Sequence, residues 1–241
     1  MKIKIDFIDS IIDFNTSNIY SFEIYNKKYL YRIASLFYSI AKGQLVEEVM
    51  CFDEYNTEVS LIGKMRTFTE YFDFAFDSKK YTSDITKYVL SNIEQYESEN
   101  ILKTYLKLSK LLDKELSKSE LPISVSTEEG IENVIKLFKL KIYQKEDLLD
   151  NLFLIIDLEV ALHTNKILCF MNLKQYLTKE ELFEFYKYIT YNSINIIFIE
   201  STKYEYIEEY EKIIIIDQSL EESMVWYFKG TLSKFFNINL Q

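Results

Sequence analysis

Glycine and proline are rare in this sequence, which has four Gly and one Pro in 241 residues. So few turn-forming residues exclude collagen-like, proline-rich and Gly/Ser-linker proteins. A site built on a glycine-rich loop is excluded as well, unless one of the four glycines stands at a suitable place. The low glycine content therefore argues against an ordinary nucleotide hydrolase.

Metal-binding and redox residues are equally scarce, with two Cys and one His. Cys51 and Cys169 each lie in an apolar run, which predicts buried free thiols in a reducing cytoplasm rather than a disulfide framework. With His163 alone, one chain cannot assemble a zinc site of His and Cys ligands. Asp6 and Asp9 interrupt any signal peptide, and no stretch approaches 18 uncharged apolar residues, so we expect a cytoplasmic protein without a membrane span.

The residues that are present describe a globular chain. Hydrophobic residues make up 48% and charged residues 27%, which is enough apolar material for a full core and excludes intrinsic disorder. The formal net charge of −10 excludes a uniformly basic nucleic-acid clamp, but it leaves room for a local basic surface. Only two of the 28 cations are arginines. Any DNA binding is therefore expected to use lysine contacts with phosphates rather than recognition of guanine bases by arginine.

Short apolar runs alternate with helical patterns over most of the chain. The runs at residues 167–171, 194–199 and 213–216 are almost entirely apolar, and helical segments connect them, while residues 19–24 form a short apolar run with alternation. Strands of this kind are typical of a parallel sheet that helices cover on both sides. From residue 64 to 118 the pattern is helical throughout, and a further strand is expected at 140–143.

The sequence therefore predicts an α/β fold, in which a parallel-sheet head domain carries an α-helical leg insertion. The head is expected to be discontinuous, with residues 1–62 and 120–222. Residues 63–119 are expected to form the leg, and residues 223–241 a C-terminal extension of unknown role.

A phosphate-binding loop has no good candidate in this head. The nearest fragment is Gly63-Lys64, where Glu58 replaces the first glycine of the motif and Met65 replaces the hydroxyl residue that binds Mg²⁺. The junction between the strand at 19–24 and the helix at 27–41 contains no glycine. We therefore expect a sheet without a phosphate loop.

Two groups of charged side chains are candidate binding residues. Cationic side chains gather on and around the helical insertion. The candidates for contact with DNA phosphates are Lys64, Arg66, Lys79, Lys80 and Lys87. Carboxylates gather between the insertion and the head, where they could supply oxygen ligands to Ca²⁺: Asp113, Glu115, Glu120, Glu128 and Glu129. Ser126 and Glu129 also have the spacing of a helix capping box.

Two other functions remain open from the residues alone. Glu200 and Asp217 stand near the ends of predicted adjacent strands, where α/β enzymes place their ligands, so a divergent metal-dependent nuclease or nucleotide hydrolase is one alternative. The other is an interaction scaffold, whose aromatic surface binds protein partners.

Three segments of the second half carry a resemblance to a known family. They are Lys166–Glu181, Tyr188–Asn192 and Ile196–Ser201. These segments resemble the CRISPR-associated, ring-forming, DNA-end-binding spacer-acquisition protein family of type II-A systems. The resemblance implies a head related to nucleotide-binding ATPases that lacks their catalytic loop, together with a helical leg.

The resemblance also implies an assembly and partners. Four subunits would form a homotetrameric ring with a basic lumen, which threads linear double-stranded DNA from its ends and performs no catalysis. Bound Ca²⁺ would hold the geometry of head and leg, and by neighbourhood its candidate ligands are Glu120, Glu128 and Glu129. The expected partners are the CRISPR integrase complex and the RNA-guided effector nuclease. A ring can gather lysines inside and carboxylates outside, so the negative net charge and DNA binding do not conflict.

Overall fold

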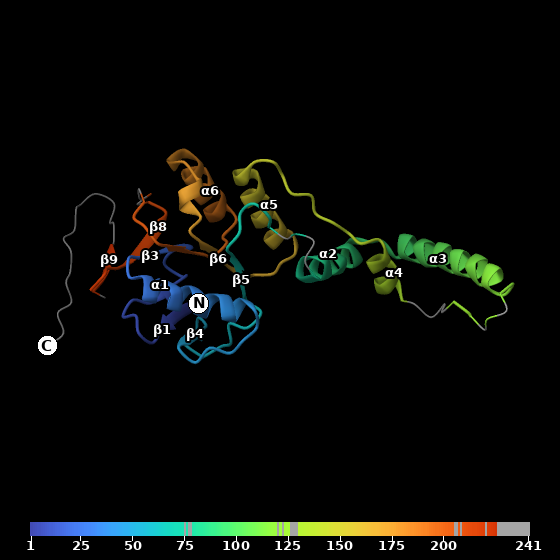
Figure 1. Cartoon of the computed structure of the whole chain (residues 1–241), viewed down its shortest axis with the longest axis horizontal. Helices are drawn as coiled ribbons and strands as arrows, with labels where there is room; N and C mark the ends of the chain where they lie inside the picture. Colours follow the sequence, from blue (N-terminus) through green and yellow to red (C-terminus); the bar gives the residue numbers. More distant parts are fainter. Residues whose placement is uncertain are drawn as a thin grey trace. The chain divides into compact units, whose positions relative to one another are not determined.

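A computed structural model describes residues 1–74, 76, 79–119, 121, 123–125, 130–204, 207, 209–219 and 221–225. The chain divides into two compact units (Figure 1). Unit 1 consists of Met1–Phe74 and Lys145–Gln241, and unit 2 consists of Ala75–Gln144. Unit 1 is therefore discontinuous in the sequence, and unit 2 is an insertion within it.

The centre of unit 1 is a six-stranded sheet in the order β5-β6-β7-β3-β8-β9. All neighbours are parallel except β8 and β9, and the bounds of the strands are β3 (Ile19–Ile24), β5 (Met65–Phe68), β6 (Ile167–Met171), β7 (Ile196–Glu200), β8 (Glu211–Ile216) and β9 (Glu222–Val225). The predicted parallel sheet is confirmed. Parallel neighbours need long crossover connections, which here are helices.

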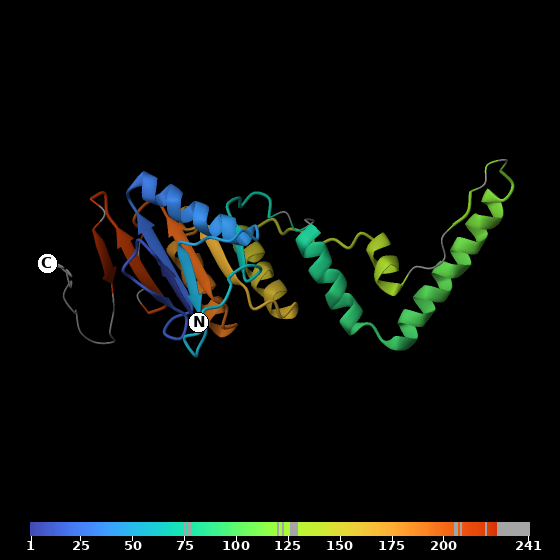
Figure 2. The same cartoon turned by 90° about the horizontal axis from the view of Figure 1, so that it is seen from below.

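Both faces of this sheet are covered (Figures 1 and 2). One face packs against α1 (Lys27–Ala41) and a small antiparallel sheet, whose strands are β1 (Lys2–Ile5), β2 (Ile12–Asp13) and β4 (Val49–Phe52). The other face packs against α5 (Leu148–Ala161) and α6 (Lys179–Tyr191), where Phe170 and Phe198 of the sheet meet Phe185 and Tyr186 of α6. The near-continuous apolar strands follow from this double coverage.

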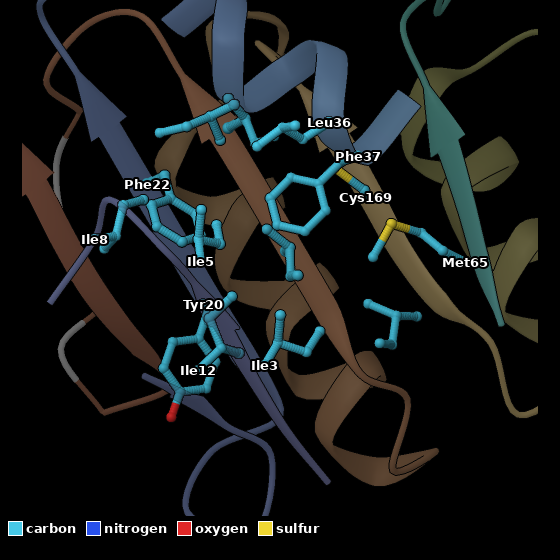
Figure 3. Close-up of a cluster of buried hydrophobic side chains, with 14 of the residues drawn as sticks. Ile3, Ile5, Ile8, Ile12, Tyr20, Phe22, Leu36, Phe37, Met65 and Cys169 are labelled. Carbon is cyan, nitrogen blue, oxygen red and sulfur yellow. The ribbon is translucent and has the colours of Figure 1, made fainter. Parts of the chain in front are cut away.

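The core on the α1 face joins residues from distant parts of the chain (Figure 3). Phe22 of β3 lies against Phe37 of α1 at a centroid distance of 6.3 Å, and both side chains are fully buried. Ile3 and Ile5 enter from the small sheet. Burying a side chain of this size contributes about 1.5–3 kcal/mol, so this cluster stabilises the contact between the two sheets.

Capping residues set the helix starts of unit 1. Asn26 caps α1, Asp147 caps α5, and Thr178 begins α6 with a full capping box to Glu181. Each cap satisfies amides that have no partner within the helix. At the other end of α1, Gly43 has a φ of +84°, a left-handed conformation that favours glycine.

Unit 2 is helical in its described part. It contains α2 (Lys79–Asn92), α3 (Gln95–Leu116) and the short α4 (Ile131–Leu137), which contacts both of the longer helices and buries Val134 and Ile135. The expected strand at 140–143 is wrong. These residues belong to unit 2, where the described chain offers them no strand to pair with, so their alternating pattern has no ladder to complete.

The division between the units also differs from the expected one. Unit 2 begins at Ala75 rather than at residue 63, because Met65–Phe68 is the strand β5, paired in parallel with β6. It ends at Gln144 rather than at 119, because α4 packs on α2 and α3 instead of on the sheet. A four-residue strand is too short to show its own periodicity, which explains why the helical reading extended over it.

Candidate functional site

The junction between β3 and α1 lies at the place where nucleotide-binding sheets carry their phosphate loop. It consists of Tyr25 and Asn26 only. The Asn26 side-chain oxygen accepts hydrogen bonds from the amides of Lys28 (3.0 Å) and Tyr29 (3.3 Å). These are the amides that would otherwise face an anion at a helix N-terminus. The junction is thus closed by its own cap, and no phosphate loop is present here.

The Gly63-Lys64 fragment does not form such a loop either. Gly63 has a φ of +77° in a turn, and β5 follows directly after Lys64. A phosphate loop requires a strand before it and a helix after it, so that helix amides point at the phosphate. Gly63 instead lies between two strands, β4 and β5, and a strand rather than a helix follows it.

A buried polar network lies on the α6 face of the sheet. Lys174, in the short 3₁₀ helix η1 (Lys174–Tyr176), donates from Nζ to Glu211 Oε2 (2.6 Å) and to Ser21 Oγ (2.9 Å). The hydroxyl of Tyr186 donates to the same carboxylate oxygen at 3.0 Å. The network ties η1, β3, α6 and β8 together. A buried ion pair needs such additional hydrogen bonds to offset the loss of water around its charges.

Glu200 ends β7 beside this network and is fully buried. Its Oε1 accepts from the amide of Lys174 at 3.2 Å, while Oε2 has no hydrogen-bond partner among the described residues. Burial raises the pKa of Glu200 to about 7, although Lys174 lowers it in part. A buried carboxyl of this kind prefers its neutral form.

The two strand-end carboxylates of the enzyme hypothesis are not on adjacent strands. Glu200 is the last residue of β7 and Asp217 follows β8, but β3 runs between these two strands, so the expectation of adjacency is wrong. Asp217 instead accepts hydrogen bonds from the Ser219 hydroxyl (2.8 Å) and the Glu221 amide (2.9 Å) in the β8–β9 turn. Strand order is a tertiary property, which explains the error.

The candidate phosphate-binding residues occupy different environments. Lys64 is exposed in the turn before β5, and Lys87 is exposed on α2. Arg66 is buried in β5, where it forms an ion pair with Glu159 of α5 at 2.8 Å. The assignment of Arg66 to DNA contact is therefore corrected, because its charge is paired with Glu159 inside unit 1. Lys79 and Lys80 lie in the first turn of α2, and their side chains are outside the described atoms.

Comparison with protein families decides the identity of the chain. The family model described as CRISPR-associated protein (Cas_Csn2) matches residues 44–220. The chain belongs to the CRISPR-associated Csn2 family. The match includes the segments at 166–201 from which the resemblance was inferred, and it confirms that resemblance.

A solved structure supports the Csn2-like fold. The crystal structure of Stu0660 of Streptococcus thermophilus superposes on this chain with a TM-score of 0.60 at 13% sequence identity, covering 90% of this chain and 75% of that one. At such low identity the likeness concerns the fold alone. The comparison with curated proteins finds no match. Among the described helices, none combines the length and apolar character that a membrane crossing requires.

The candidate calcium ligands of this Csn2-family chain cannot be placed. Glu120, Glu128 and Glu129 lie outside the described residues, as does the capping box expected at 126–129. Within the part of the chain that the structure describes, no three or more His, Cys, Asp or Glu side chains gather as a metal site would require.

Sequence reasoning missed one group of cations in this Csn2-family chain. Lys136, Lys139 and Lys141 line a cavity in unit 2, together with residues of α2. A signal was available in the sequence, since residues 133–145 contain four lysines and no carboxylate. The expected strand at 140–143 assigned this segment to the head and so separated it from the lysines of α2.

Proposed function

We propose that this Csn2-family chain binds the ends of linear double-stranded DNA without catalysis, as a homotetrameric ring that serves CRISPR spacer acquisition. The family match over residues 44–220 carries the CRISPR-associated role. The capped β3–α1 junction supports a role without nucleotide hydrolysis, because it offers no free helix amides to a triphosphate. The integrase complex and the RNA-guided effector nuclease are the proposed partners.

The distribution of charge supports contact between DNA and unit 2. Unit 2 contains 11 lysines and 11 acidic residues, so its net charge is zero, and the whole excess of −10 belongs to unit 1. A phosphate backbone approaching unit 2 therefore meets lysines without a net repulsive charge on that unit. Lysine contact of this kind is independent of base sequence and sensitive to salt.

Calcium is part of the proposal, with Glu120, Glu128 and Glu129 as its proposed ligands. Ca²⁺ prefers several carboxylate and carbonyl oxygens in a loose arrangement, which three neighbouring glutamates could contribute. The mass of the assembly in solution, with and without a chelator, tests this role. A tetramer that dissociates on chelation supports it, and a tetramer that persists contradicts it. A monomer under both conditions contradicts the ring.

DNA-end binding is tested by a gel shift with two forms of one duplex, linear and covalently closed circular. A ring that threads DNA from its ends binds the linear form and leaves the circle free. Equal affinity for both forms, or affinity for neither, contradicts threading. Turnover of ATP or DNA by the purified chain, abolished in Glu200→Ala, would instead support the enzyme alternative.

A further inference from the structure

Unit 2 contains a cavity of about 540 Å³ between α2 and the segment that includes and follows α4. Its volume falls in the range of small-molecule sites, and it exceeds what an isolated phosphate group needs. Three hydroxyl residues of α2, three lysines of the facing segment and one leucine line it: Thr82, Ser83, Thr86, Lys136, Lys139, Lys141 and Leu140.

The lining side chains differ in what they can offer a ligand. Thr86 is buried, and its hydroxyl donates to the carbonyl of Thr82 at 2.7 Å, which fixes this hydroxyl within α2. Ser83 is exposed, as are Lys139 and Lys141. The mobile donors are therefore the ammonium groups and the Ser83 hydroxyl. Ammonium groups on long flexible stems act as point charges that follow a phosphate without fixed geometry.

The segment that faces α2 across this cavity is positively charged, although unit 2 as a whole is neutral. No carboxylate occurs in residues 133–145. Just before this segment, Glu132 bonds Lys136 at 2.5 Å, and both side chains are half exposed. The hydrogen bond and the charge of Lys136 lower the pKa of Glu132, with a smaller contribution from Lys87 of α2. Lys87 therefore adds its charge to the same region.

We propose that this cavity receives a phosphate group of duplex DNA, held by Lys139 and Lys141 with Lys136 and Ser83 beside them. The inference rests on the proposed function and names the residues that would carry it. The volume beyond that of a phosphate leaves room for the attached sugar. The phosphate is either an internal diester or the 5′-terminal monoester of a DNA end.

The test measures the affinity of the full chain for a linear duplex over a series of salt concentrations. The double variant Lys139→Gln/Lys141→Gln is compared with Lys107→Gln/Lys110→Gln, which removes two exposed lysines of α3 outside the cavity lining. Each lost phosphate contact makes the slope of log affinity against log salt shallower by about 0.9. Because Lys139 and Lys141 are proposed to hold one phosphate together, the cavity variant is expected to lose about 0.9. The α3 variant is expected to lose much less.

A second pair of variants places a negative charge in the cavity. Ser83→Glu is expected to weaken DNA binding about tenfold, by opposing one phosphate contact at moderate salt. Ser91→Glu makes the same change at another exposed position of α2, outside the lining, and is expected to leave the affinity nearly unchanged. Because both serines are exposed, neither substitution disturbs the packing of the helix.

The two phosphate sources are separated by comparing duplexes with 5′-phosphate and 5′-hydroxyl ends. A wild-type preference for the phosphorylated end that the cavity variant loses assigns the terminal phosphate. Equal binding of both ends, weakened alike in the cavity variant, assigns an internal diester.

Two results would overturn the inference, and they can be told apart. If the cavity variants and their controls lose affinity equally, the cavity has no special role while DNA binding itself stands. If the unmutated chain binds no duplex even at low salt, the proposed function fails together with the inference.

Discussion

Lys174 and Glu211 form an ion pair inside unit 1, with 2.6 Å between Lys174 Nζ and Glu211 Oε2 and with both side chains at most 1% exposed. Lys174 lies in η1 between β6 and α6, and Glu211 is the first residue of β8. The pair therefore links the β6–α6 connection to the start of β8. Ser21 and Tyr186 add hydrogen bonds to the pair, and the amide of Ile207 donates to the other oxygen, Glu211 Oε1, at 3.3 Å.

Removal of one partner of this pair is expected to destabilise unit 1 strongly. Glu211→Gln leaves the Lys174 ammonium buried without a counter-charge, which costs about 3–5 kcal/mol of unfolding free energy. Glu48→Gln is the control, because it breaks the half-exposed pair with Arg32 (3.0 Å) and should cost less than about 1 kcal/mol. Chemical denaturation of both variants measures the difference, and similar losses would contradict a special role for the buried pair.

The stability of unit 1 is expected to fall as the pH rises towards 7. The pKa of Glu200 is raised from 4.5 to about 7 by burial, so the folded chain keeps a proton that the unfolded chain releases. The contribution of Glu200 is therefore fully present below pH 4.5 and is lost as the pH rises to 7, to an extent of roughly 3 kcal/mol.

The variant Glu200→Gln tests this pH dependence, because glutamine cannot titrate. Unfolding free energies of the two proteins are measured at several pH values between 5 and 8. The stability of the variant relative to the wild type should increase with pH over this interval and then level off. Parallel curves would show that Glu200 does not titrate in this way.

Arg66 is expected to contribute to stability, in contrast to its neighbour Lys64. Arg66→Met leaves the fully buried Glu159 carboxylate without its cation, so the unfolding free energy should fall by about 3 kcal/mol or more. Lys64→Met changes an exposed side chain and should leave it within about 0.5 kcal/mol. An Arg66 variant of wild-type stability with weakened DNA binding would restore Arg66 as a phosphate ligand.

DNA binding is expected to strengthen when the carboxylate beside the cavity is neutralised. Glu132→Gln releases Lys136 from its ion pair and removes a negative charge, which should raise affinity by up to about tenfold at moderate salt. Glu115→Gln releases Lys118 from a comparable exposed pair outside the cavity lining, and should change little. Salt titrations with a linear duplex compare the two, and equal gains would argue against the cavity.

Much of the sheet could be predicted from local pattern. The strand at 167–171 is apolar on both faces, the strand at 19–24 shows alternation, and the start of α6 carries a capping box at Thr178 and Glu181. These features follow from the alternation of side chains and from amides that need a local partner, so they are readable within a few residues. The missing phosphate loop is equally local, because the β3–α1 junction is too short and lacks glycine.

The sequence by itself determined strands β3, β6 and β7 of unit 1, the absence of glycine at the β3–α1 junction and the family, since each depends on neighbouring residues. Only the tertiary structure decided the partners of distant residues. Strand order separated Glu200 from Asp217, burial paired Arg66 with Glu159, and the packing of α4 on α2 brought Lys136, Lys139 and Lys141 to one cavity. Such contacts join segments of chain whose spacing carries no periodic signal, so they exist only once the core has formed.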